Sequence, residues 1–245
     1  MIKAILTGHS RGLGAAIART LLERGITVLA LARSPNAELG AAFPQRLHGV
    51  QLDLSDPAAL CDWLADGSLT GFVADASTAL LINNAGMLQP VGLLGTQTHE
   101  ALVHAVNLNI SAPLVLANAF AAATGGCIDR RIVHISSGAA RNPYAGWSSY
   151  CATKAALDHH ARAVALEHLP GLRIASLAPG VVDTTMQAEI RAGSVAQFPQ
   201  KERFEALHTG GQLASPAVAA GRLVDYLLGE RFGDVVDGDL RHLPG

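Results

Sequence analysis

The sequence predicts an α/β fold with a single doubly wound, mostly parallel sheet of about seven strands and helices on both faces. Three observations predict it. Short apolar runs of strand length alternate with longer segments of helical periodicity along the 245 residues. The runs are apolar at nearly every position, which is typical of strands covered on both faces. No break in composition divides the chain, so residues 1–245 are expected to form one domain.

The elements follow in a regular order. A strand at residues 2–7 leads into a helix from Gly12 to Arg24, which Gly25 ends. Further buried strands are expected at 26–32, 47–52, 79–82, 131–135, 172–177 and 235–236. Further helices are expected after Ser55, at about 98–122, at 148–168 and from Ser215-Pro216 to about Leu228. Ser55 is expected to cap the first of these, and Pro113 to bend the second.

Composition narrows the class of function. The net charge is −2 and the isoelectric point about 6.5, which argues against nucleic acid and against an anionic membrane as partners. The apolar runs are interpreted as shorter than the roughly 18–20 residues of a membrane span, and the start of the chain is interpreted as a strand. The odd and widely spaced Cys61, Cys127 and Cys151 indicate reduced thiols and a cytoplasmic protein. The ten histidines show no metal-ligand spacing, so no metal site is expected.

A glycine-rich loop, Thr7 to Gly14, lies between the first strand and the first helix. Gly8 permits a tight turn, Gly12 lets the backbone approach a pyrophosphate, and Gly14 permits close packing of helix on strand. The helix start supplies free N–H groups and a partial positive charge. The loop therefore predicts dinucleotide binding.

A tyrosine and a lysine one helical turn apart predict a general acid/base. Tyr150 and Lys154 are expected on the same helix face. A lysine charge favours tyrosinate, so Lys154 is expected to lower the pKa of Tyr150 toward the working range.

These motifs together resemble the short-chain dehydrogenase/reductase family, over essentially the whole chain. The resemblance implies a catalytic tetrad of Asn107, Ser137, Tyr150 and Lys154, with Asn107 holding a water linked to Lys154; Ser136 is the alternative serine. It also implies a nicotinamide cofactor site, which includes Tyr150 and Lys154. The other implied cofactor residues are Gly8, Ser10, Arg11, Gly12, Leu13, Gly14, Arg33, Asp53, Asn84, Ala85, Gly86, Pro179, Gly180, Val182 and Thr184.

The cofactor is predicted to be NADP(H). The position at the end of the second strand, where NAD enzymes usually carry a carboxylate, is Ala32, and Arg33 follows it. A guanidinium pairs with a 2′-phosphate through charge-assisted hydrogen bonds, and Arg11 is expected to reach the same region. The alternative is that both arginines are solvated surface charges.

The run from Pro143 to Cys151 resembles the sepiapterin reductase and benzil reductase branch of the family. This resemblance implies a substrate pocket for a 1,2-dicarbonyl or aromatic ketone, lined by Ser137, Tyr144, Trp147, Tyr150 and Met186. Two alternatives stay open: Trp147 as a core residue, and Asp237 as a substrate anchor. Residues 187–213 are expected to form a substrate lid, with Gly193, Pro199, Gly210 and Gly211 as hinges, or else a surface insertion.

The predicted function is therefore an NADPH-dependent carbonyl reductase. Three alternatives remain: an alcohol or hydroxysteroid dehydrogenase running in the oxidative direction, an acyl-carrier ketoreductase, and a non-catalytic NADP(H) sensor. The expected partners are a small carbonyl substrate and further copies of the chain, because relatives assemble as homodimers or homotetramers through the two long helices.

Overall fold

One seven-stranded sheet forms the centre of the computed structural model, which describes residues 1–192, 194 and 197–243. The strand order is β3-β2-β1-β4-β5-β6-β7, and every neighbouring pair is parallel. The strands are β1 (Ile2–Thr7), β2 (Thr27–Ala32), β3 (Leu47–Gln51), β4 (Thr78–Asn83), β5 (Asp129–Ile135), β6 (Leu172–Ala178) and β7 (Asp237–Asp239). The order reverses direction between β1 and β4, where such sheets bind ligands. The predicted fold class is confirmed.

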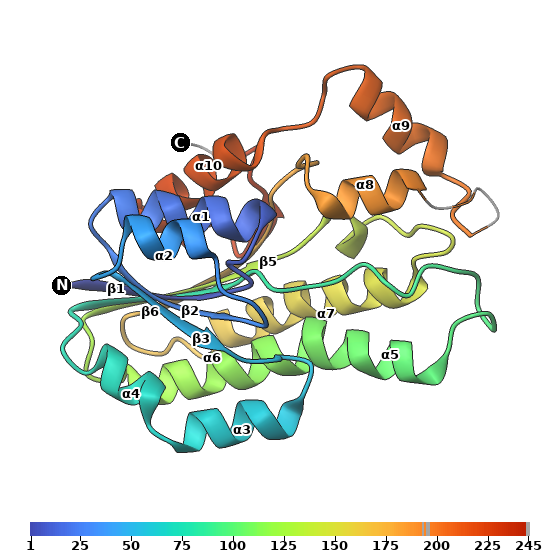
Figure 1. Ribbon diagram of the computed structural model, residues 1–245. Helices are drawn as coiled ribbons and strands as arrows, with labels where there is room; N and C mark the ends of the chain where they lie inside the picture. Colours follow the sequence, from blue (N-terminus) through green and yellow to red (C-terminus); the bar gives the residue numbers. More distant parts are fainter. Residues whose placement is uncertain (193, 195–196, 244–245) are drawn as a thin grey trace.

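Helices cover both faces of the sheet (Figure 1). One face carries α1 (Gly12–Glu23), α2 (Ala37–Ala42) and α10 (Pro216–Leu228). The other face carries α3 (Pro57–Ala65), α4 (Ser68–Val73), α5 (His99–Val106), α6 (Ala112–Ala123) and α7 (Ser148–Ala165). Alternate residues of β1 feed two separate cores: Ala4 and Leu6 pack with α1 and α10, and Ile5 packs with α3 and α6.

Two helices, α8 (Thr185–Ala192) and α9 (Lys201–Thr209), stand beyond the sheet at the upper right of Figure 1. They pack on each other and lie within the segment expected to form a lid. Of the expected hinges, Gly193 lies outside the described residues. Gly211 has a φ of +65°, a conformation that glycine adopts without strain.

Several boundaries differ from the sequence prediction. The helix after Ser55 is capped by Asp56, whose carboxylate accepts from the N–H groups of Ala58 and Ala59, while the Ser55 hydroxyl donates to Asp53. The last strand lies at Asp237–Asp239, just after the predicted 235–236. Helices α2 and α4 were not predicted, because six residues are too few to show a helical period.

The long helix predicted at 98–122 contains a π-helical turn. This turn, Asn107–Ser111, separates α5 from α6, and the N–H of Ala112 bonds to the carbonyl of Asn107. Pro113 has no N–H to give to the carbonyl of Asn109, which explains the break at this point.

The same helix corrects one composition argument. His99–Ala123 is long and apolar enough, by length and composition, to cross a membrane, so the statement that no run reaches this length is wrong. In the structure its α6 part packs on β4 and β5, with Leu116 and Phe120 fully buried. A core helix passes the same test, so the run is weak evidence for a membrane span.

Candidate active site

A cavity of about 920 Å³ lies at the carboxyl ends of the strands and collects the predicted site residues. The residues predicted to bind the cofactor that line it are Gly8, Ser10, Arg11, Gly12, Leu13, Gly14, Arg33, Asp53, Asn84, Ala85, Gly86, Pro179, Gly180, Val182 and Thr184. The predicted catalytic and substrate residues that line it are Ser137, Tyr144, Trp147, Tyr150, Lys154 and Met186. Asn107 and Asp237 are not among its lining residues. The same cavity is thus lined by the glycine loop and by Tyr150 and Lys154.

The glycine loop is shaped by close backbone contacts. Gly8 has a φ of +75°, and its N–H donates to the carbonyl of Leu31 at 2.8 Å. A Cβ on Gly14 would lie only 1.9 Å from the carbonyl oxygen of Gly8, so any side chain there would displace the loop. The start of α1 therefore faces the cavity with bare backbone, which is the arrangement that a pyrophosphate needs.

Residues after β4 brace this loop. The Asn84 side-chain amide donates to the carbonyls of Thr7 and Gly8 at 2.9 and 3.1 Å. The Thr7 hydroxyl accepts from the N–H groups of Asn84 and Ala85. Across the cavity, Thr184 packs near Gly12, so the two predicted cofactor segments lie close together.

Two exposed arginines come from the glycine loop and from the residue after β2. Arg11 and Arg33 both line the cavity, and neither guanidinium has a hydrogen-bond or ion-pair partner among residues 1–192, 194 and 197–243. Asp53 lies close enough to Arg33 for the two charges to interact. Burial acts to raise the pKa of Asp53, but hydrogen bonds from Ser55 and the charge of Arg33 outweigh it, so the pKa is lowered.

Tyr150 and Lys154 lie on the buried face of α7, as their spacing predicts. The Lys154 Nζ donates to the carbonyl of Ile135, the last residue of β5, at 2.7 Å. It also lies 5.8 Å from the centroid of the Tyr150 ring. The helix thus presents an acid and a cation to the same end of the cavity.

The pKa values correct the expected direction for the tyrosine. Burial raises the pKa of Tyr150, and a hydrogen bond with the Ser137 hydroxyl offsets only part of the rise. Burial also lowers the pKa of Lys154 to about 8, which the charge of Asp158 partly offsets. The prediction that Lys154 lowers the pKa of Tyr150 is therefore wrong for this state, because desolvation dominates both groups. A raised pKa keeps the phenol of Tyr150 protonated at neutral pH, and it also makes the phenol a weaker proton donor.

The two serines divide as the sequence suggested. Ser137 caps a short 3₁₀ turn, Gly138–Ala140, and its Oγ accepts from the N–H of Ala139 at 3.2 Å. Its hydroxyl also reaches Tyr150. Ser136 instead donates to the buried carboxylate of Asp158 at 2.6 Å.

The asparagine beside the lysine is Asn109 and not Asn107. The Asn107 side chain donates to the carbonyl of Ser55 at 3.2 Å, away from Lys154. A Cβ on Gly86 would lie 3.3 Å from the Asn109 Oδ1 and 3.4 Å from the Lys154 Nζ, so both atoms lie against this glycine. The sequence held a signal for this choice. Pro113, four residues after Asn109, leaves the Asn109 carbonyl without its helical partner.

The Asn109 side chain is itself fully used. Its Oδ1 accepts from the N–H of Met87 at 2.9 Å, and its Nδ2 donates to the Met87 carbonyl at 2.8 Å and to the Thr153 hydroxyl at 3.2 Å. It ties the π-helical turn to the segment after β4 and to α7. The prediction of a tetrad asparagine therefore moves by two residues.

Aromatic side chains pack together beside Tyr150. Trp147 stacks on Phe198 with ring centroids 4.2 Å apart and planes 2° apart, and it meets Tyr150 edge to face. Phe204 of α9 packs on both Trp147 and Phe198. Trp147 therefore both packs in this aromatic cluster and lines the cavity, so it fits the prediction of a pocket residue and the alternative of a core residue.

Asp237 is engaged elsewhere. Its Oδ2 accepts from Arg162 on α7 at 2.9 Å, outside the lining of the cavity. The structure therefore gives no support to the alternative of Asp237 as a substrate anchor. The nearby residues that do line the cavity are Asp239 and Arg241, which form an ion pair at 2.7 Å.

The fold and this site define a nucleotide-dependent oxidoreductase. A family model described as short chain dehydrogenase matches residues 3–194, and the chain belongs to this family. The chain is 37% identical over 241 residues to a benzil reductase ((S)-benzoin forming) of Bacillus cereus, covering 95% of this chain and 97% of the relative. It is 34% identical over 245 residues to a sepiapterin reductase of Meriones unguiculatus, covering 93% and 92%.

Solved structures give the same result. A short-chain dehydrogenase/reductase from Burkholderia vietnamiensis is 46% identical, with a TM-score of 0.72 and coverage of 99% of this chain and 98% of that one. A short chain dehydrogenase from Burkholderia cenocepacia J2315, solved in complex with NADP, is 26% identical, with a TM-score of 0.74 and coverage of 96% and 94%. The resemblance seen in the sequence is confirmed at the level of the family.

Proposed function

We propose that the protein is an NADPH-dependent carbonyl reductase that acts on 1,2-dicarbonyl or aromatic ketones. The observation that carries the proposal is that one cavity is lined both by the guanidinium groups of Arg11 and Arg33 and by Ser137, Tyr150 and Lys154. The cofactor preference and the substrate class are the parts to be tested, since membership of the family implies only a nicotinamide-dependent oxidoreductase.

The nucleotide end of the cavity fits NADP(H). The bare backbone at Gly14 suits the pyrophosphate, because any side chain would collide with the loop. Arg11 and Arg33 are free to bind a 2′-phosphate, and no carboxylate stands at the end of β2. The relative of known structure that carries NADP supports the same choice.

The residues at the other end supply the acid. When bound, the nicotinamide supplies the hydride. Tyr150 donates its phenolic proton to the carbonyl oxygen of the substrate, and the Ser137 hydroxyl polarises that oxygen by a hydrogen bond. Lys154 holds positive charge near Tyr150 and stabilises the tyrosinate that forms. We assign to Asn109 the task first given to Asn107: its backbone carbonyl, freed by Pro113, holds the water through which Lys154 meets solvent.

The aromatic wall argues for the substrate class. Trp147, Tyr144 and Phe204 offer flat apolar faces beside Tyr150, which match aryl rings on either side of a reacting carbonyl. Benzil reductases are among the relatives that match nearly the whole chain. We propose that residues 187–213 act as the lid over this pocket, since Phe204 lines the cavity and Phe198 stacks on Trp147.

The proposal covers the setting of the enzyme too. We place it in the cytoplasm with its thiols reduced, acting on a small molecule without nucleic acid or membrane partners and without a metal. We expect a homodimer or homotetramer built on the long helices, where Val103 and Val106 of α5 are 60% and 40% exposed. Light scattering on the purified protein measures the number of subunits, and a strict monomer would contradict this part.

The direct test compares substrates and cofactors. Oxidation of NADPH is followed with benzil, an aliphatic diketone, a pterin ketone and a monoketone, and each assay is repeated with NADH. We expect turnover of the diketones with NADPH and little with NADH. Equal rates with both cofactors would refute the role of Arg33. If NADPH binds but no carbonyl is reduced, while an alcohol is oxidised with NADP⁺, the oxidative alternative is correct.

A further inference from the structure

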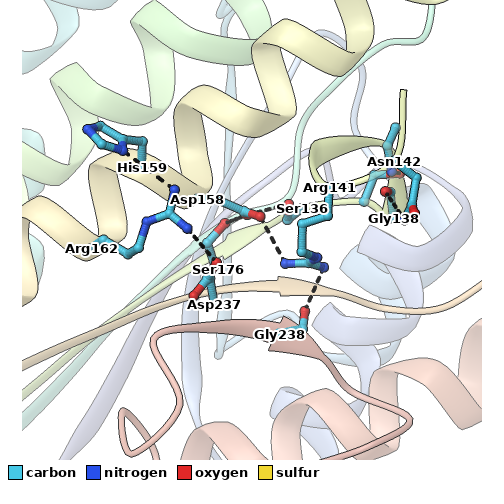
Figure 2. Close-up of polar contacts among 12 residues, drawn as sticks. Ser136, Gly138, Arg141, Asn142, Asp158, His159, Arg162, Ser176, Asp237 and Gly238 are labelled. Carbon is cyan, nitrogen blue, oxygen red and sulfur yellow. Dashed lines mark hydrogen bonds and ion pairs between the residues drawn. The ribbon is translucent and has the colours of Figure 1, made fainter. Parts of the chain in front are cut away.

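A buried carboxylate beside the active site gathers hydrogen bonds from three elements. Asp158 lies on the buried face of α7, and its side chain is 3% exposed. Its Oδ1 accepts from the Ser136 hydroxyl at 2.6 Å and from the Ser176 hydroxyl of β6 at 2.7 Å. Its Oδ2 accepts from the Arg141 guanidinium at 2.9 Å. Figure 2 shows the three donors converging on this one side chain.

Two of these donors bracket the serine of the proposed reaction. Ser136 precedes Ser137 directly, and Arg141 follows the 3₁₀ turn that Ser137 caps. The second amino group of Arg141 donates to the carbonyl of Gly238 in β7 at 3.1 Å (Figure 2). Both ends of the turn are therefore held by Asp158, and the turn is held in its place between α7, β6 and β7.

The same carboxylate lies one helical turn beyond Lys154. Residues four apart on a helix are neighbours, so the two charges lie on the same buried face. The titratable and charged groups packed around Lys154 are Tyr150 on its own helix, His134 on β5, and Arg141 from the turn. Burial and the charges of His160 and Lys154 lower the pKa of His134 to about 3, so His134 is neutral. The guanidinium of Arg141 is already bound to Asp158. Asp158 is thus the negative charge that acts on Lys154.

We propose that Asp158 is a positioning residue of this active site, whose carboxylate fixes the turn that carries Ser137 and balances the charge of Lys154. It touches neither substrate nor the reacting atoms. Through its hydrogen bonds with Ser136 and Arg141 it positions the Ser137 hydroxyl. Through its negative charge it favours the protonated form of Lys154. The kinetic part of its test rests on the proposed reductase function, and the spectroscopic part does not.

The chain offers a clean spectroscopic test, because it has only three lysines, Lys3, Lys154 and Lys201. Lysine labelled with carbon-13 at the ε-methylene gives one signal for each of the three residues in a two-dimensional NMR spectrum. The signal that disappears in Lys154→Arg is that of Lys154. The titration midpoint of Lys154 is then measured in the wild type and in Asp158→Asn, which keeps the shape but removes the charge. We expect a fall of about 1 unit or more in the variant, since losing an opposite charge disfavours the protonated amine.

The control is Asp129→Asn. Asp129 forms comparable ion pairs with Arg131 and Arg173, at the start of β5 and therefore at the opposite end of the strand from the site. Losing it removes a paired carboxylate without touching Ser136, Arg141 or Lys154. Its Lys154 midpoint should equal that of the wild type. The inference is overturned if Asp158→Asn leaves the midpoint unchanged, or if both variants shift it equally.

The kinetic readout follows the pH dependence of kcat/KM for a diketone from about pH 6 to about pH 10. In Asp158→Asn we expect the alkaline limb to move to lower pH, because Lys154 loses its proton sooner, and kcat to fall about 10- to 100-fold as Ser137 shifts. Asp129→Asn should keep the wild-type profile. An equal fall at every pH with an unmoved limb would show a structural role only and refute the charge argument. A wild type without any reductase activity would refute the proposed function. The NMR titration would still test whether the charge of Asp158 acts on Lys154.

Discussion

A methyl group at Gly146 should open the substrate pocket from a distance. Gly146 lies in the loop before α7 with a φ of +83°. A Cβ there would lie 2.1 Å from the carbonyl oxygen of Gln197 and 3.4 Å from the Cα of Phe198. An ordinary contact between these atoms needs about 3.5 Å, so Gly146→Ala must push the segment carrying Phe198 away by more than about 1 Å.

The magnitude has two parts. A left-handed alanine costs roughly 1–2 kcal/mol of stability wherever it stands. The displaced segment also loses the stacking of Phe198 on Trp147, now 4.2 Å between centroids, which is worth about 0.5–1.5 kcal/mol beyond its buried area. Since a shift of about 1 Å in a positioning element can cost about 100-fold in rate, we expect kcat/KM for benzil to fall about 10- to 100-fold. Binding of NADPH should change little, because Gly146 is not among the residues that line the cavity.

The matched control is Gly67→Ala, since Gly67 has a φ of +81° and nothing within 4 Å of an added Cβ. It carries the backbone strain without the collision. Thermal unfolding measures the strain in both variants, NADPH fluorescence measures cofactor binding, and steady-state kinetics with benzil measures the pocket. If Gly146→Ala and Gly67→Ala have the same kcat/KM, the segment at Gln197 does not control the pocket and the lid proposal is wrong.

Three further outcomes follow from the site. Tyr150→Phe should bind NADPH with wild-type affinity and lose at least about 1,000-fold in kcat, because the proton donor is gone; substantial residual turnover would refute its role as the acid. Arg33→Asp should reverse the preference from NADPH to NADH by about 100-fold or more in the ratio of kcat/KM, as a carboxylate repels a 2′-phosphate; an unchanged ratio in that variant would exclude Arg33 from the cofactor site. Asn109→Ala should lower kcat about 10-fold or more, because it removes the side-chain hydrogen bonds to Met87 and Thr153 that hold the π-helical turn and its backbone carbonyl in place, while Asn107→Ala should stay near the wild type; the reverse order would restore the first assignment.

Local patterns were sufficient for the fold and for most of the site. Parallel strands buried on both faces are apolar throughout, and the helices between them show a period of 3.6. The sequence pattern therefore predicted the alternation of strands and helices. The glycine loop was readable because only glycine tolerates φ of +75° at Gly8 and the contact of Gly14 with the Gly8 carbonyl. Tyr150 and Lys154 were readable because four residues make one helical turn.

The sequence predicted short elements and capping residues less well. The sequence left Ser55 and Asp56 as capping candidates for α3, since serine and aspartate side chains can both accept from free N–H groups; Asp56 is the cap because the Ser55 hydroxyl donates to Asp53. The last strand gains its partner only when β6 is in place, so its bounds shifted to Asp237–Asp239.

By itself the sequence determined the fold class and predicted the glycine loop and the pair Tyr150 and Lys154, because each depends on spacing within one element or one turn; the prediction of Ser137 came from the family resemblance. Only the tertiary structure decided that Asn109 stands beside Lys154 and that Tyr150 has a raised pKa. These properties arise from burial and from contacts between segments far apart in the chain, where desolvation and three-dimensional distance set the chemistry and no local pattern records them.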